Sequence, residues 1–106
     1  MPYITMVAYP ETPTATFDED YYVQKHLPMV FQHWERYGLL DWQVISFDKT
    51  SDGSRSYLAA PYMTWKSVES FNAATSSDSM GLMIEDLKNF SNIEPVFLNG
   101  SGIGCR

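Results

Sequence analysis

The chain has 106 residues, and its 44% hydrophobic and 19% charged residues are typical of a globular protein. We expect a single domain spanning residues 1–106. The formal net charge is −6, and the seven basic residues are scattered along the chain, which argues against nucleic acid or an anionic membrane surface as a partner.

Cys105 is the only cysteine and therefore has no partner for an internal disulfide. No apolar run approaches the roughly 20 residues of a membrane span. The first ten residues also lack the charged and apolar regions of a secretion signal. The sequence therefore predicts a cytoplasmic protein.

The first part of the chain predicts a strand followed by a long helix. Residues 3–9 (YITMVAY) are β-branched and aromatic, which is typical of a strand. Thr16 and Glu19 have the spacing of a capping box, so we expect the helix to begin with Thr16 as its N-cap. It should run towards Tyr37 and end at Gly38.

The remaining elements follow in the order strand, strand, helix, strand. Strands are predicted at 39–47 and 55–65, with Asp52-Gly53 marking the turn between them. A short helix at 66–74 is followed by a break and by apolar residues at helical spacing from Met80 onwards. Residues 92–100 form the last strand.

This β-α-β-β-α-β order is that of a ferredoxin-like α+β fold. It predicts a four-stranded antiparallel sheet with both helices on one face. The strands 3–9 and 55–65 are apolar on both faces, so a second surface needs a cover. We therefore expect a homodimer packed through its sheet faces. Pro61 falls in a central strand, where we expect a bulge around 60–62.

His26 is the main candidate for chemistry. It lies two residues before Pro28, at the border of the apolar face of the first helix, with Tyr22 one turn earlier. Pro28 should bias Leu27 away from the helical region and open a gap between helix and sheet. Burial there would lower the pKa of His26 and keep it neutral, as a general base requires. The alternative is a hydrogen-bonded core histidine.

The segments YPETPTATFDEDYYVQKHLPMV and NFSNIEPVFLNG resemble the opening and closing parts of EthD family proteins. The resemblance implies the dimeric α+β barrel fold and a pocket between helices and sheet that His26 faces. Relatives accompany polyketide and aromatic pathways, and some are described as dehydratases. Proteins that share the fold include cofactor-independent monooxygenases.

We therefore expect a cofactor-independent enzyme that acts on a small aromatic or polyketide-like metabolite. His26 would transfer a proton in a dehydration or isomerisation, and Tyr22 would orient it or polarise a substrate oxygen. Two alternatives remain open: a cofactor-free oxygenase of phenols or anthrones, and a non-catalytic binding protein.

Other residues are candidates for contacts with the ligand. Trp42, Tyr62 and Trp65 lie on predicted strands and either line the pocket or belong to the core or the interface. Asn92 either binds the ligand or caps the turn into the last strand. His33 follows His26 by seven residues, but no third ligand has suitable spacing, so we expect no metal.

Overall fold

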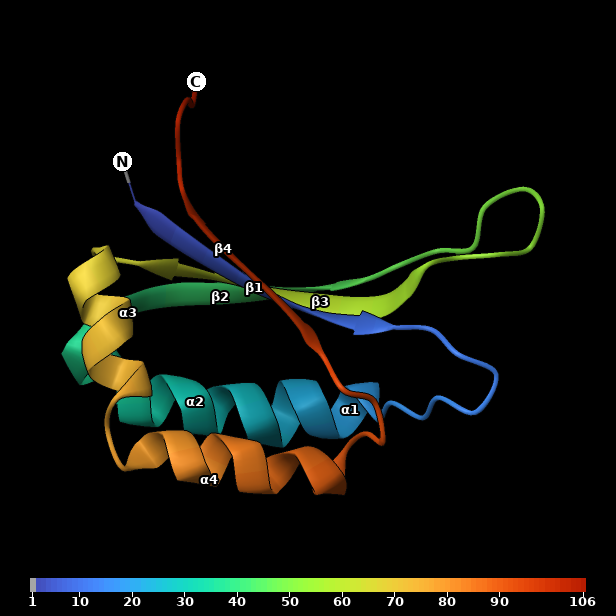
Figure 1. Cartoon of the computed structure of the whole chain (residues 1–106), viewed down its shortest axis with the longest axis horizontal. Helices are drawn as coiled ribbons and strands as arrows, with labels where there is room; N and C mark the ends of the chain where they lie inside the picture. The colour runs from blue at the N-terminus through green and yellow to red at the C-terminus, as the bar shows by residue number, and fades with distance from the viewer. Residues whose placement is uncertain (1) are drawn as a thin grey trace.

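The computed structural model describes residues 2–106 and has the predicted ferredoxin-like α+β fold. The sheet is antiparallel, with the strand order β2-β3-β1-β4. The helices lie on one face of it (Figure 1). The strands are β1 (Tyr3–Pro10), β2 (Leu39–Ser46), β3 (Tyr57–Trp65) and β4 (Val96–Ser101). The helical segments are α1 (Glu19–Tyr21), π-helical Tyr22–His26, α2 (Leu27–Trp34), 3-10 Glu35–Tyr37, α3 (Val68–Thr75), α4 (Ser79–Asp86) and 3-10 Leu87–Asn89.

The first helix begins later than the capping box predicted. Asp18 is the N-cap, and its carboxylate accepts a hydrogen bond from the backbone N–H of Tyr21 at 3.0 Å. Thr16 is held elsewhere, because its N–H donates to the side chain of Asn92 at 2.8 Å. The capping-box prediction was therefore wrong, since a tertiary contact fixes Thr16 outside the helix.

The turn before Pro28 is a π-helix. The N–H of Leu27 donates to the carbonyl of Tyr22, five residues earlier. Leu27 keeps helical angles (φ −66°, ψ −38°), so the predicted departure from the helical region was wrong. A proline has no N–H to complete the normal ladder, and the wider π turn lets the helix continue through it. Such π turns occur often at functional sites.

The helical run ends at Gly38, as predicted. Its φ of +115° is in the left-handed region, which favours glycine. A Cβ added there would lie 2.3 Å from the Oγ of Ser70 on α3. Gly38 thus allows the close approach of α3 to the end of this run.

Pro61 lies in the central strand β3 without the predicted bulge around Ala60–Tyr62. It pairs with Val44 of β2 in register, and the register against β1 is the same on both sides of it. The two recorded irregularities lie at Tyr9/Pro10 and at Leu39/Asp41. The sheet therefore accommodates the missing N–H of proline without inserting an extra residue.

The core lies between the sheet and the helices and is rich in aromatic side chains. Trp65 of β3 is fully buried and packs against Trp34 and Phe71, with ring centroids 5.7 and 5.4 Å away. Its Nε1–H donates to the Oγ1 of Thr5 at 3.0 Å, so its polar atom is satisfied. No helix in residues 2–106 is long and apolar enough to cross a lipid bilayer.

The opposite face of the sheet is also largely apolar, as the strand sequences indicated. Strand alternation and register assign side chains from all four strands to this outer face. No helix of the described chain lies over it (Figure 1). Its apolar members are Ile4, Met6, Ala8, Ile45, Ala60, Tyr62, Val96 and Leu98.

Candidate active site

A cavity of ≈ 380 Å³ lies between the helices and the inner face of the sheet. Its volume falls within the range of small-molecule sites. The wall is mostly apolar and comes from β1, β3, the π turn, α2, α4, the segment between α4 and β4, and β4 itself. Its members are Val7, Tyr9, Tyr22, His26, Leu27, Val30, Trp34, Met63, Met80, Met83, Ile84, Leu87, Phe90, Pro95 and Phe97.

His26 lies on this wall and is only 7% exposed. Its ring stacks on Tyr22, with centroids 5.1 Å apart, and also contacts Phe90 at 4.7 Å. Its Nδ1 lies 2.9 Å from Oδ2 of Asp86 at the end of α4. A histidine on the cavity wall is therefore paired with a carboxylate, and this pair joins the first helical run to α4.

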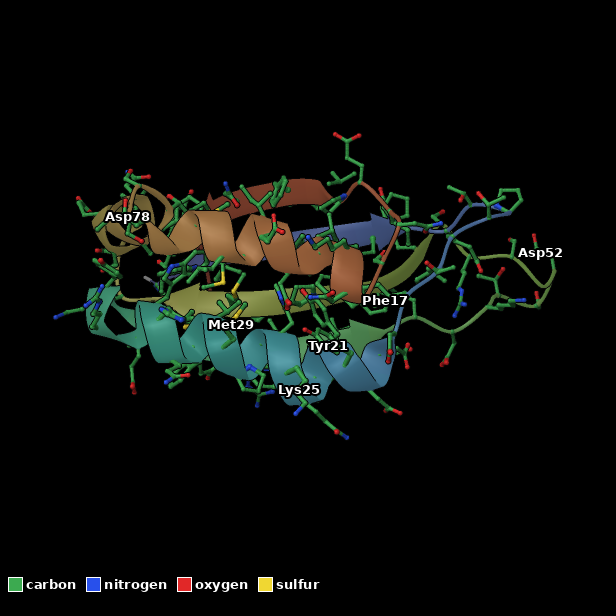
Figure 2. All side chains as sticks on the ribbon, turned by 90° about the horizontal axis from the view of Figure 1, so that it is seen from below. Phe17, Tyr21, Lys25, Met29, Asp52 and Asp78 are labelled. Carbon is green, nitrogen blue, oxygen red and sulfur yellow. The ribbon has the colours of Figure 1, made fainter. Side chains whose placement is uncertain are left out.

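Asp86 is held in place by two further donors. The hydroxyl of Tyr21 and the side-chain amide of Asn89 both donate to its Oδ1, at 2.7 and 2.9 Å. Figure 2 shows Tyr21 on the helix facing α4. Partial burial alone would raise the pKa of Asp86, but the hydrogen bonds from Asn89, His26 and Tyr21 outweigh it and lower that pKa. Asp86 is therefore an ionised acceptor at neutral pH.

These contacts fix the state of His26. Burial lowers its pKa, partly opposed by Asp86, so the ring is neutral near pH 7, as predicted from its position. An ionised carboxylate only accepts hydrogen bonds, so Nδ1 carries the proton and donates it to Asp86. The second nitrogen, Nε2, is then an unprotonated acceptor.

Nε2 is also accessible. It makes no hydrogen bond within residues 2–106. In that part of the chain, every fully buried side-chain nitrogen or oxygen has a hydrogen-bond partner. Nε2 is therefore not fully buried. The arrangement gives a neutral imidazole whose basic nitrogen is free and whose other nitrogen is oriented by a carboxylate, which is the geometry of a general base.

Tyr22 lies on the same wall and is 1% exposed. Its hydroxyl oxygen lies 3.5 Å from that of Tyr9 on β1. Burial raises the pKa of Tyr22 well above its ordinary value and that of Tyr9 to about 12. Both side chains therefore remain neutral phenols.

The other four predicted contacts lie away from the cavity. Trp65 is buried in the core, and Trp42 is half-buried on β2. Tyr62 lies on the outer face of the sheet. Asn92 bonds to the backbone of Thr16 and Thr14, which ties its loop to the start of the first helix. A ligand-binding role for these four residues stays a prediction.

Asp86 is the functional residue that the sequence reasoning missed. The apolar spacing of the second long helix was read from Met83 and Leu87, and Asp86 lies beside that stripe. An acidic residue at the border of an apolar helix face was the available signal, matching the position of His26 on the first helix. In residues 2–106, no group of three or more His, Cys, Asp or Glu side chains could hold a metal ion.

Neither a protein-family model nor a curated protein matches this sequence. Solved structures do match it. An EthD-like protein from Ralstonia eutropha JMP134 is 25% identical with a TM-score of 0.88, over 99% of this chain and 95% of the other. An EthD family protein from Bacillus halodurans C-125 is 18% identical with a TM-score of 0.75, over 97% of this chain and 100% of the other.

A more distant match extends the comparison to another group of proteins with this fold. A protein from Nitrosomonas europaea, provisionally described as an antibiotic biosynthesis monooxygenase, is 11% identical with a TM-score of 0.59. The alignment covers 96% of this chain and 99% of the other. At this identity, the match concerns the fold alone.

Proposed function

Since this chain belongs to the EthD family, we propose that it is a cofactor-independent enzyme that binds a small aromatic or polyketide-like metabolite in the cavity. His26 would be its general base and acid. The observation that supports this proposal is the His26–Asp86 pair at 2.9 Å on the wall of an otherwise apolar cavity. The fold match to EthD-like proteins is compatible with a small-molecule enzyme or binding role.

The proposed reaction is a dehydration or an isomerisation. Nε2 of His26 removes a proton from a carbon of the ligand, and the Asp86 carboxylate stabilises the imidazolium that forms. The imidazolium then returns the proton, either to a leaving hydroxyl group or to another carbon. The apolar wall excludes water from the intermediate.

A cofactor-free oxygenase is the second candidate. The same base would deprotonate an electron-rich phenol or anthrone, and the resulting anion would react with oxygen directly. The neutral imidazole of His26 on the wall of an apolar cavity is compatible with this reaction as well. Oxygen uptake in the presence of a ligand identifies it, whereas a dehydratase works equally well under nitrogen.

The first test is binding and turnover of a panel of phenols, anthrones and lactones. Wild type, His26→Ala and His33→Ala are compared. His33→Ala is the control, because His33 is half-buried on α2 and does not line the cavity. We expect aromatic ligands to bind all three proteins and turnover to fall about 10²-fold or more in His26→Ala only. Binding without product in wild type would indicate a binding protein. No binding at all would refute the proposal.

We also propose that the protein forms a homodimer through the outer face of the sheet. The apolar residues on that face support this, with Leu98 at 52% and Val96 at 39% exposed. Light scattering should give twice the 12.1 kDa mass of the chain. Leu98→Asp should give the monomer, while Val68→Asp, an exposed apolar position on α3, should not. A monomeric wild type would refute this proposal.

A further inference from the structure

The polar atoms on the cavity wall can be accounted for one by one. Only four of the lining side chains carry a nitrogen or oxygen: Tyr9, Tyr22, His26 and Trp34. Trp34 donates its Nε1–H to the Oγ of Ser79 at 2.8 Å, so it is satisfied. Nδ1 of His26 is likewise held by a carboxylate. What remains for a ligand is Nε2 of His26 and the two tyrosine hydroxyls.

The two hydroxyls satisfy each other only in part. Tyr9 is 3% and Tyr22 1% exposed, and neither hydroxyl has another partner within residues 2–106. Their oxygens are 3.5 Å apart, longer than the usual 2.7–2.8 Å of an O–H···O bond. Two hydroxyls bring two protons to a single mutual contact, so one proton has no acceptor. Leaving such a donor buried and unpaired is costly.

Each hydroxyl can donate to the other or accept from it. When the hydroxyl of Tyr9 donates to that of Tyr22, the proton of Tyr22 is free for a ligand. Tyr22 also stacks on His26, with the rings 21° from parallel. A free hydrogen-bond donor and a free base therefore lie next to each other on an apolar wall. This combination fits a ligand that presents an acceptor oxygen beside an acidic proton.

We propose that the hydroxyl of Tyr22, itself hydrogen-bonded by Tyr9, binds a carbonyl oxygen, so that the ligands of this cavity are apolar ketones with a hydrogen on the carbon next to the carbonyl. This inference rests on the proposed function and specifies its substrate class. Tyr22 would contact the substrate, and Tyr9 would be a positioning residue that acts through Tyr22.

The chemistry that this arrangement favours is enolisation. Nε2 of His26 takes the proton from the carbon next to the carbonyl, and the C–H electron pair becomes a C=C bond. The π electrons of the C=O bond move to the oxygen, which the hydroxyl of Tyr22 stabilises by hydrogen bonding. The imidazolium returns the proton to carbon or to oxygen, so the step needs no oxidant or reductant.

A matched pair of probes tests the inference in the unaltered protein. 2-Tetralone is an apolar bicyclic ketone with acidic hydrogens, and tetralin is the same skeleton without the oxygen. The binding of tetralin, corrected for the difference in hydrophobicity between the two probes, gives the affinity expected for 2-tetralone without a hydrogen bond. We expect wild type to bind 2-tetralone about 3- to 10-fold more tightly than this, because one hydrogen bond contributes about that much. It should also exchange the acidic hydrogens of 2-tetralone for deuterium above the buffer rate, as seen by NMR.

Phenylalanine variants test the roles of the two hydroxyls, since they keep the rings and the packing. Tyr22→Phe should remove the preference for the ketone and lower deuterium exchange by about 10²-fold. Tyr9→Phe should lower both partially while leaving the binding of tetralin unchanged, which a merely structural role would not do. Tyr57→Phe is the control, because Tyr57 is exposed at the end of β3 and does not line the cavity.

The results separate this inference from the proposed function. Equal preference for the two probes, unchanged in Tyr22→Phe, would overturn the inference while leaving a small-molecule site in place. Failure of both probes and of the whole ligand panel to bind would overturn both. Exchange that depends on His26 but not on Tyr22 would also refute the carbonyl site, while supporting His26 as the base.

Discussion

Replacing Asp86 by Asn should switch the proton on His26 from Nδ1 to Nε2. Oδ1 of Asp86 already accepts from the hydroxyl of Tyr21 and the amide of Asn89. In Asp86→Asn the carbonyl oxygen should stay with these two donors. The new NH₂ group then faces Nδ1 of His26, which has to accept instead of donate.

Both consequences of this change lower the rate. The protonated Nε2 no longer accepts a proton, and the imidazolium loses its charged partner at 2.9 Å. A hydrogen bond to a charged group contributes about 1.5–3 kcal/mol, which corresponds to roughly 10- to 160-fold in rate. We therefore expect proton transfer to fall about 10²-fold with little change in ligand binding.

Nitrogen NMR of the imidazole rings measures the tautomer directly. The chain has two histidines, so His33→Asn assigns the spectrum. Wild type should show the Nδ1–H tautomer for His26, and Asp86→Asn the Nε2–H tautomer. Glu85→Gln is the matched control, because it removes the neighbouring carboxylate, which pairs with Lys88 at the surface.

Two results would refute this reasoning. One is a wild-type His26 that carries its proton on Nε2 at neutral pH, since the carboxylate would then not set the tautomer. The other is an Asp86→Asn protein that keeps both the wild-type tautomer and the wild-type rate. A loss of folding in Asp86→Asn is detected by its melting temperature, and the wild-type spectrum still tests the tautomer in that case.

Three further outcomes are expected for stability. Because burial lowers the pKa of His26 below its ordinary 6.5, the unfolded chain binds this proton more readily, so this contribution to stability is present above pH 6.5 and is lost as the pH falls below it. In urea unfolding, the free energy of unfolding of the wild type should fall by at most about 1.4 kcal/mol per pH unit, and that of His26→Gln should fall less. An identical pH dependence of stability in both proteins would contradict this expectation. Gly38→Ala should destabilise the fold by about 1–3 kcal/mol, because the position has φ +115° and the new Cβ would meet Ser70; an unchanged melting temperature would show that α3 moves aside at no cost. Asp18→Ala should lower the free energy of unfolding by about 1 kcal/mol, because it removes the N-cap. Thr16→Val, which removes only a hydroxyl group, should lower it by less than about 0.5 kcal/mol. A larger loss in Thr16→Val than in Asp18→Ala would show that Thr16 is the N-cap after all.

The sequence predicted the fold because the fold depends on local patterns. Short β-branched strands alternate with amphipathic helices, and this order allows few topologies. Gly38 was identified as a helix end because only a glycine easily takes the conformation that the end requires. His26 and Tyr22 were also found from the sequence, since both lie near the border of one helix face.

Local patterns failed where contacts distant in sequence decided the structure. Thr16 matches a capping box, but its hydrogen bond to Asn92, 76 residues later, fixes it outside the helix. Pro61 in a central strand predicts a bulge, but β3 pairs in register with a neighbouring strand on each side, and this pairing keeps β3 regular at Pro61.

The candidate site needed the tertiary structure most of all. Asp86 lies 60 residues after His26, and only the packing of α4 beside the first helical run brings its carboxylate to Nδ1. The meeting of the Tyr9 and Tyr22 hydroxyls likewise depends on how the helix crosses the sheet. The sequence by itself determined the elements, their order and the histidine, because these follow from neighbours along the chain. The partners of that histidine were decided by tertiary structure alone, because a hydrogen bond depends on distance in space.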